Sequence, residues 1–361
     1  MRRALLVALA AAIAAAPAVA APPPLKPLAQ RIVAAGAPGA VVYTRGPKGV
    51  RAAAAGRADL RKHTALTPAM RFRVGSITKS FVAVVVLQLA AEGELQLDDT
   101  VEEWLPGAVP NGTAITLRQL LNHTSGLPNY TANGSFLSAF SANRRRIWSP
   151  LELLGYASGP LEFAPGSSWA YSNTNYVLLG LVIETATGRP LADELRARIF
   201  GPLNLSHTTL PTALAMPSPC AHGYMRPGNG LIAIPGKWLD VTAWHPSWIW
   251  AAGAIVSTAA DVARFYSAVS SGRLLPAAQL AELRRTTEIG SGYAYGLGIT
   301  RLILPCGEAW GHTGGVPGYS SAAFASRDGS RAAVVLVNEA IATPGESGAF
   351  ERALGTAFCK R

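Results

Sequence analysis

The stretch FRVGSITKSF, residues 72–81, sets a serine and a lysine three positions apart at the start of a long apolar segment. The apolar residues that follow predict a helix over residues 76–91, which Gly93 ends. Residues three apart share one face of a helix, so the Ser76 hydroxyl and the Lys79 ammonium would meet one turn apart. The positive end of the helix would also favour an alkoxide at Ser76.

Two interpretations of this pair are open. Ser76 and Lys79 are a nucleophile and its base, because a serine hydroxyl attacks poorly until a neighbouring group removes its proton. Alternatively, they are a helix-capping serine and a surface lysine. Residues 82–89 are apolar nearly all round, which predicts a buried helix and favours a buried, perturbed lysine.

Strand and helix patterns predict an α/β (α+β) fold with sheet-forming ends and a helical middle. One sheet would be built from both chain ends and interrupted by a large helical insertion. The expected sheet part is residues 26–75 with 251–361, and the expected helical part is residues 76–250. The predicted strands are residues 40–43, 50–55, 296–299, 320–325 and 332–337, and further helices are predicted at residues 117–122, 150–158, 177–187, 256–269 (capped by Ser257) and 348–357.

A second motif, Tyr171-Ser172-Asn173, follows in the helical middle. A phenol has an ordinary pKa of about 10, so it acts as a base near neutrality only beside a fixed cation. Lys79 would supply that cation, and the amide of Asn173 would hold both Lys79 and a substrate carbonyl. The alternative is a loop tyrosine packed beside an asparagine turn.

A third motif, His312-Thr313-Gly314-Gly315, precedes a predicted strand. The two glycines would let a ligand lie against the backbone, and the amides of Gly315 and Ser76 would form an oxyanion hole. The alternative is a plain glycine turn with a surface histidine.

Signatures of other hydrolases do not occur in the sequence. It has no G-x-S-x-G elbow, which disfavours an α/β-hydrolase, and no H-E-x-x-H or similar pair, which disfavours a zinc enzyme. No metal is therefore predicted. His123, within NHTSG at residues 122–126, is expected to be a structural hydrogen-bonding residue.

The first residues predict export rather than folded structure. Arg2 and Arg3 precede an apolar run over residues 4–16, and Ala18-Val19-Ala20 has the form of a cleavage site. A membrane anchor is the alternative, but the run is too short to span a bilayer. We therefore expect a signal peptide at residues 1–20, cleavage near Ala20, a secreted domain at residues 21–361 and no membrane anchor.

Charge and cysteine usage fit an exported protein. The net charge is +11, and the basic residues are scattered along the sequence. A nucleic-acid-binding protein would gather them in one patch, so this distribution favours a protein that works beside an anionic cell envelope. Of the three cysteines, Cys306 and Cys359 are the expected disulfide, since this bridge would fasten the chain end to a strand. Closing that loop is worth about 4 kcal/mol in the chain-entropy model. Cys220 is then left as a free thiol.

The three motifs in this order resemble the serine β-lactamase and penicillin-binding superfamily, in its class C-like branch. The resemblance covers nearly all of the chain beyond the leader and implies a β-lactamase/transpeptidase-like fold with an antiparallel sheet. Within the branch the chain looks most like the secreted Streptomyces D-alanyl-D-alanine carboxypeptidases, which share the H-T-G motif and a similarly placed cysteine pair. Besides residues 72–81, the matching stretches are residues 121–127, 171–176, 199–205, 252–258, 295–298 and 311–314.

The resemblance implies roles for the motif residues. Ser76 would be the acylated nucleophile, with Lys79 and Tyr171 acting together as the base and then as the acid. Asn173 would hold the substrate amide. Trp248 stands where carboxypeptidases of the branch have a tryptophan in the cleft wall.

On the leaving-group side the chain departs from those carboxypeptidases. His312 and Thr313 would line that side, but Thr300 and Gly315 stand where the carboxypeptidases bind the terminal carboxylate with an arginine and a threonine. Arg301 is adjacent to Thr300, yet strand neighbours point to opposite faces. Losing a bidentate grip on the carboxylate weakens the case for a strict carboxypeptidase.

The leading hypothesis is an acyl-transfer hydrolase that forms an acyl-enzyme at Ser76 and needs no cofactor. Its expected substrate is a peptidoglycan-type acyl-D-Ala-D-Ala peptide or a small acyl compound, with β-lactams as covalent ligands and the protein as a monomer. A β-lactamase, an esterase and a D-aminopeptidase are alternatives of the same class. A non-catalytic binder or β-lactam sensor is the alternative of a different class, although a binder has no need of the intact Ser76, Lys79 and Tyr171 set.

Overall fold

The computed structural model of the chain describes residues 24–226, 238–290 and 292–359. The predicted signal peptide lies outside these residues. No helix in the described ranges is long and apolar enough to cross a membrane.

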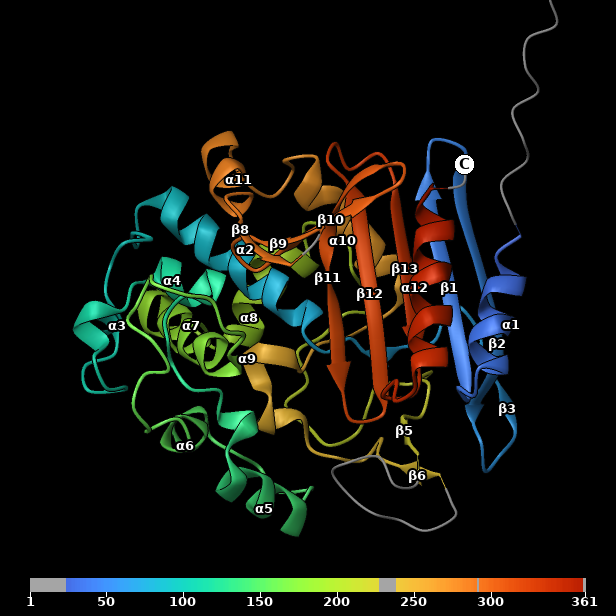
Figure 1. Cartoon of the computed structure of the whole chain (residues 1–361), viewed down its shortest axis with the longest axis horizontal. Helices are drawn as coiled ribbons and strands as arrows, with labels where there is room; N and C mark the ends of the chain where they lie inside the picture. The colour runs from blue at the N-terminus through green and yellow to red at the C-terminus, as the bar shows by residue number, and fades with distance from the viewer. Residues whose placement is uncertain (1–23, 227–237, 291, 360–361) are drawn as a thin grey trace, which may run out of the picture.

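A nine-stranded sheet forms the centre of the molecule, and all of its strand pairs are antiparallel. Its strand order is β3-β2-β1-β13-β12-β11-β10-β9-β8, so the N-terminal strand β1 pairs with the C-terminal strand β13 (Figure 1). The prediction of one sheet built from both chain ends is therefore confirmed. The strands are β1 (Gly39–Gly46), β2 (Gly49–Asp59), β3 (Thr64–Ala65), β8 (Thr287–Gly290), β9 (Tyr293–Tyr295), β10 (Thr300–Leu304), β11 (Gly307–Val316), β12 (Tyr319–Ser326) and β13 (Ala332–Val337).

Helices cover both faces of this sheet and form the middle of the chain. Helices α1 and α12 lie on one face, and the remaining helices lie on the other (Figure 1). One apolar cluster fills the space under α1 and α12, and a larger one lies between the opposite face and the remaining helices. Short strand pairs lie outside the main sheet: β4 (Phe72–Arg73) with β7 (Val256–Ser257), and β5 (Tyr224–Met225) with β6 (Leu239–Asp240). The helices are α1 (Lys26–Ala34), α2 (Ile77–Glu92), α3 (Val101–Trp104), α4 (Leu117–Asn122), α5 (Gly134–Ala142), α6 (Pro150–Gly155), α7 (Asn173–Thr187), α8 (Leu191–Leu195), α9 (Trp250–Gly253), α10 (Ala259–Ser270), α11 (Ala277–Leu283) and α12 (Pro344–Cys359).

The predicted central helix is α2, and it is buried along nearly its whole length. Every residue from Ile77 to Leu87 is buried, as the all-round apolar pattern predicts. Ser76 is its N-cap residue, and Gly93 ends it in the left-handed conformation with φ 80°. The position of α2 between the sheet and α7 sets its first turn at the junction of the two parts of the fold.

One predicted strand is wrong, and one predicted helix has a different start and a different capping residue. Residues 296–299 are not a strand but the turn between β9 and β10, in which Gly298 has φ +72°. The predicted helix at 256–269 starts three residues late, because Val256 and Ser257 pair with β4. Thr258 rather than Ser257 caps α10, and its side chain accepts a hydrogen bond from the Asp261 amide.

In the structure Cys306 and Cys359 form a disulfide, with their Cα atoms 5.4 Å apart. It links the turn between β10 and β11 to the last residue of α12. Cys220 has no disulfide partner among the described residues and is only partly buried.

We expect the protein purified without reductant to weigh two hydrogens less than its fully reduced form. Replacing Cys306 and Cys359 by serine should lower the free energy of unfolding by about 2–4 kcal/mol, because the unfolded chain then regains its loop entropy. Urea denaturation followed by circular dichroism measures this change. Cys220→Ser is the control, and this variant should still weigh two hydrogens less than its reduced form. An unchanged free energy of unfolding in the double variant would contradict a stabilising disulfide between Cys306 and Cys359.

Candidate active site

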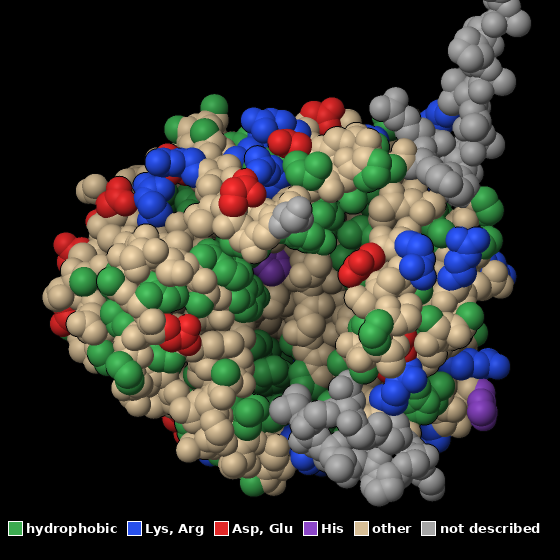
Figure 2. All heavy atoms as spheres, in the orientation of Figure 1, with side chains coloured by type: hydrophobic (Ala, Val, Ile, Leu, Met, Phe, Trp, Pro, Cys, Tyr) green, Lys and Arg blue, Asp and Glu red, His purple; other side chains and the backbone are tan. Residues whose placement is uncertain are grey.

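The candidate site lies at the first turn of α2, where the helical part meets β11. A space-filling view shows a hollow between the helices and this side of the sheet, with a histidine side chain on its floor (Figure 2). The backbone before Ser76 is fixed from both sides, since the Val74 amide donates to Ile255 O at 3.0 Å and Val74 O accepts from Ser321 Oγ at 2.8 Å.

Lys79 is fully buried, and its amine holds the site together. Nζ lies 3.1 Å from Ser76 Oγ, 2.7 Å from Asn173 Oδ1 and 2.7 Å from Ala252 O. No carboxylate of the described residues pairs with it, and burial lowers its pKa well below the ordinary value. The surface-lysine interpretation is therefore wrong, and burial shifts the amine toward its neutral, proton-accepting form.

Tyr171 lies on the other side of the serine. Its hydroxyl hydrogen-bonds Ser76, and its ring centroid is 4.7 Å from Lys79 Nζ. Burial nevertheless raises the pKa of Tyr171 above its ordinary value, so the phenol keeps its proton at neutral pH. The sequence argument expected a phenolate beside a cation; the environment instead favours a neutral amine beside a neutral phenol.

Asn173 is the first residue of α7, four residues before the predicted start of this helix. Its Oδ1 accepts from Lys79, as the sequence indicated, but its Nδ2 donates to Thr131 Oγ1 at 3.0 Å. Thr131 therefore engages one of the two Nδ2 hydrogens, and the other is left for the substrate carbonyl that the sequence analysis expected Asn173 to bind.

His123 supports the tyrosine from behind. The ring is completely buried, its centroid is 4.3 Å from that of Tyr171, and its Nδ1 accepts from the Ser172 amide at 3.2 Å. Burial, with smaller contributions from Lys79 and His312, lowers the pKa of His123 well below the ordinary value. The sequence analysis expected a structural hydrogen-bonding residue here; Nδ1 has this role, whereas Nε2 is buried without a hydrogen-bond partner among the described residues.

The end of β11 forms the sheet side of the site. His312 is buried, and its Nε2 lies 2.9 Å from the Tyr295 hydroxyl. Burial lowers the pKa of His312 to about 4, so its imidazole is neutral at neutral pH. Thr313 and Gly315 are exposed toward solvent, whereas Gly314 is partly buried.

Glycines let β11 approach the backbone of the nucleophile. A Cβ on Gly75 would lie 2.7 Å from Gly315 N, and a Cβ on Gly314 would lie 2.0 Å from Val74 O. The amide of Gly315 is thus brought beside the residue that precedes Ser76. This proximity is what an oxyanion hole made from the Ser76 and Gly315 amides requires.

The remaining predicted residues lie at the edges of the site. Thr300 begins β10 and pairs with Gly311. Arg301 extends to Glu288 and Glu308, at 2.5 Å and 4.0 Å. Its guanidinium is therefore committed to ion pairs and does not replace the missing carboxylate-binding arginine.

Trp248 packs into an aromatic cluster beside the site. Its ring centroid lies 4.9 Å from that of Phe140 and 6.4 Å from that of Phe136, and its carbonyl accepts from the Tyr130 hydroxyl at 2.7 Å. Trp248 and Val316, which follows the glycines of β11, line the same small pocket. The ring is thus partly structural and partly a wall of this pocket.

Sequence reasoning missed three partners in the site. The Ala252 carbonyl accepts from Lys79, Thr131 holds Asn173, and Tyr295 contacts His312. A carbonyl carries no residue signature, and Thr131 lies in a short turn with no motif. Tyr295 and Ala252 had a signal, since each begins a stretch, residues 295–298 and 252–258, that was noted for its resemblance.

Comparison with known proteins gives consistent matches. Residues 25–357 match the family described as Beta-lactamase. Penicillin-binding protein 4* of Bacillus subtilis (strain 168) is 29% identical over 293 residues, which cover 79% of this chain and 64% of that protein. The chain thus spans somewhat less than two thirds of the length of this curated relative.

Two solved structures resemble the chain over almost their whole length. A D-stereospecific amidohydrolase from Streptomyces sp. is 40% identical with a TM-score of 0.84, covering 91% of this chain and 97% of that chain. A D-amino acid amidase from Ochrobactrum anthropi SV3, complexed with L-phenylalanine, is 28% identical with a TM-score of 0.81, covering 92% and 96%.

We expect Gly314→Ala to separate β11 from the backbone before Ser76. The added methyl overlaps Val74 O, so unfolding should become easier by about 2 kcal/mol or more. Thermal unfolding measures this loss. Gly315→Ala is the matched control, because nothing lies within 4 Å of its added Cβ; equal destabilisation by both variants would contradict the close contact.

We expect stability to fall as the pH is lowered from about 6.5 to about 4. The pKa of His312 is about 4 when folded and about 6.5 when unfolded, so the unfolded state binds more protons across this window and stability rises with pH. His312→Gln should flatten part of this dependence in urea unfolding at pH 5 and pH 7, with the exposed His207→Gln as control. If His312→Gln leaves the pH dependence of stability unaltered, His312 is not the group that causes it.

Proposed function

Since the chain belongs to the β-lactamase family, we propose that it is an active-site-serine hydrolase that cleaves amide bonds after D-configured acyl residues through an acyl-enzyme at Ser76. The family membership and the mixed α/β fold shared with the solved neighbours confirm the resemblance and the fold class predicted from the sequence. The match over residues 25–357 shows membership of the family, and the hydrolase activity and its substrate are our proposal.

The contact of Lys79 Nζ with Ser76 Oγ at 3.1 Å carries this proposal. A neutral Lys79 amine takes the serine proton as Oγ attacks the acyl carbon. The amides of Ser76 and Gly315 stabilise the charge that develops on the carbonyl oxygen. The Tyr171 phenol gives its proton to the leaving amine and regains one from the Lys79 ammonium. Water then cleaves the ester by the same steps in reverse order.

Two observations favour uncharged leaving groups over a terminal carboxylate. Arg301 is held by Glu288 and Glu308, and Gly315 has no side chain where the related carboxypeptidases carry a threonine. The names of the two solved neighbours, a D-stereospecific amidohydrolase and a D-amino acid amidase, support an amide substrate of D configuration.

A D-alanyl-D-alanine carboxypeptidase is the second candidate. The His312-Thr313-Gly314 motif favours it, as does the similarity to a penicillin-binding protein. In this case a peptidoglycan-type peptide is the substrate, and β-lactams acylate Ser76. We further propose that the protein is exported, loses residues 1–20 and works as a monomer, as its sequence suggests.

The first test is the intact mass of the protein after incubation with benzylpenicillin. We expect a covalent adduct on the unaltered protein and none on Ser76→Ala. Lys79→Ala should slow adduct formation by about 10²–10⁴-fold, because the proton acceptor is lost. Circular dichroism establishes that each variant folds. Adduct formation that persists in Ser76→Ala would rule out Ser76 as the nucleophile.

The second test compares substrates by kcat/KM. We expect D-phenylalanine amide to be cleaved at least tenfold faster than L-phenylalanine amide, and faster than an acyl-D-Ala-D-Ala peptide. If the acyl-D-Ala-D-Ala peptide is instead cleaved faster than D-phenylalanine amide, the result supports a D-alanyl-D-alanine carboxypeptidase. Rapid consumption of penicillin indicates a β-lactamase, and cleavage of p-nitrophenyl acetate alone indicates an esterase. Without hydrolysis of any of these compounds, a non-catalytic binder is the better explanation.

A further inference from the structure

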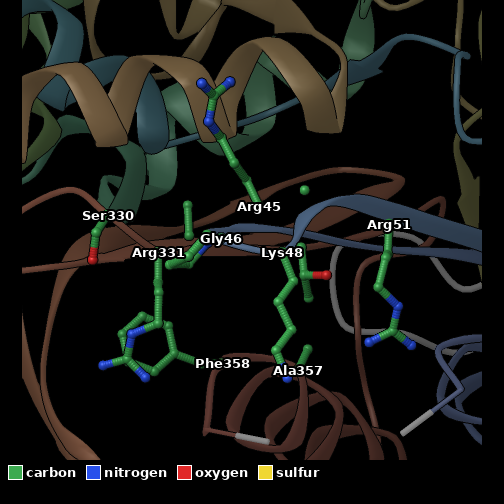
Figure 3. Close-up of a pocket in the computed structure, with 12 residues that line it drawn as sticks. Arg45, Gly46, Lys48, Arg51, Ser330, Arg331, Ala357 and Phe358 are labelled. Atoms are coloured by element: carbon green, nitrogen blue, oxygen red, sulfur yellow. The ribbon is translucent and has the colours of Figure 1, made fainter. Parts of the chain in front are cut away.

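A second cavity lies on the face of the sheet that α1 and α12 cover, away from Ser76. Its volume is about 410 Å³, within the range of small-molecule sites. The β1–β2 turn, the start of β13 and the end of α12 enclose it (Figure 3). The proposed hydrolase function has no use for this cavity.

The cavity is basic. Arg45, Lys48, Arg51 and Arg331 are among its lining residues, and none of the lining residues is acidic. Figure 3 shows Lys48, Arg51 and Arg331 pointing to the side of the sheet where α12 lies, whereas Arg45 points the opposite way. Three cationic side chains therefore surround one opening.

Two of these cations are not neutralised by the protein. Elsewhere arginines pair with carboxylates, as Arg118 does with Asp98 and Glu282. By contrast, Lys48 and Arg331 form no ion pair with any described residue. The Arg331 guanidinium lies over the Phe358 ring at 5.2 Å, and its Nη1 is buried without a hydrogen-bond partner. A buried guanidinium nitrogen without a partner is costly, so an external acceptor would stabilise it.

The end of α12 offers another explanation for these cations. Helix carbonyl ends attract positive charge. In the described part of the chain, however, neither Lys48 nor Arg331 donates a side-chain hydrogen bond to a carbonyl of α12. The helix end also leaves the open volume between the cations unexplained.

We propose that this cavity binds a phosphate group whose small organic carrier lies against Phe358. A planar guanidinium donates two parallel hydrogen bonds to phosphate, and a lysine adds a compact charge. The Phe358 ring and the stem of Arg331 supply an apolar wall for the carrier. Because the cavity lies behind the sheet, a bound phosphate leaves the candidate active site open.

Isothermal titration of the protein with glycerol 3-phosphate at low ionic strength tests the proposal. We expect saturable binding that weakens with added salt, and Lys48→Glu and Arg331→Gln should each raise Kd at least tenfold. Hydrolase turnover should be unchanged in both variants. Lys62→Glu is the matched control, because it makes the same charge change in the exposed turn beyond the other end of β2.

Co-sedimentation with phosphatidylglycerol vesicles distinguishes the source of the phosphate. Vesicle binding that glycerol 3-phosphate displaces and Lys48→Glu weakens supports a lipid headgroup, and binding of glycerol 3-phosphate alone supports a soluble phosphate compound. The proposal is overturned if glycerol 3-phosphate gives no saturable binding, or if Lys62→Glu weakens binding as much as Lys48→Glu does.

Discussion

The buried amine of Lys79 is the constraint on which the rest of the site depends. Three hydrogen bonds reach Nζ from separate parts of the chain: Ser76 at the start of α2, Asn173 at the start of α7, and the Ala252 carbonyl at the end of α9. An amine without a carboxylate partner is tolerated there because these oxygens replace water. The same burial lowers its pKa, so the architecture that hides the lysine also makes it a base.

Close backbone contact is the second requirement, and glycine meets it. The oxyanion-hole geometry depends on β11 approaching the segment before Ser76 more closely than any side chain permits. One contact between β11 and the segment before Ser76 thus sets the positions of both the strand and the serine. The aromatic and histidine rings around Tyr171 then pack against one another and fill the remaining space.

Much of the fold and of the candidate site was predictable from residue types. The apolar pattern after Lys79 predicted its burial, and the motif order predicted which residues converge. Contacts through the backbone were not predictable, because the Ala252 carbonyl could belong to any residue. The engagement of Asn173 by Thr131 depends on a short turn far away in sequence. The strand wrongly predicted at 296–299 failed because Gly298 takes a positive φ that alternation does not reveal.

The pairing of β1 with β13 has a consequence for the order in which the chain folds. Ala40 pairs with Val337, so β1, the first strand to be synthesised, pairs with β13 only after nearly the whole chain has been made. Synthesis proceeds from the N-terminus, and most of the chain leaves the ribosome before the central sheet is able to form. Contacts this distant in sequence slow folding, because loop entropy is lost before they are gained. A chain with this topology completes its central sheet only after nearly all of its residues have been synthesised.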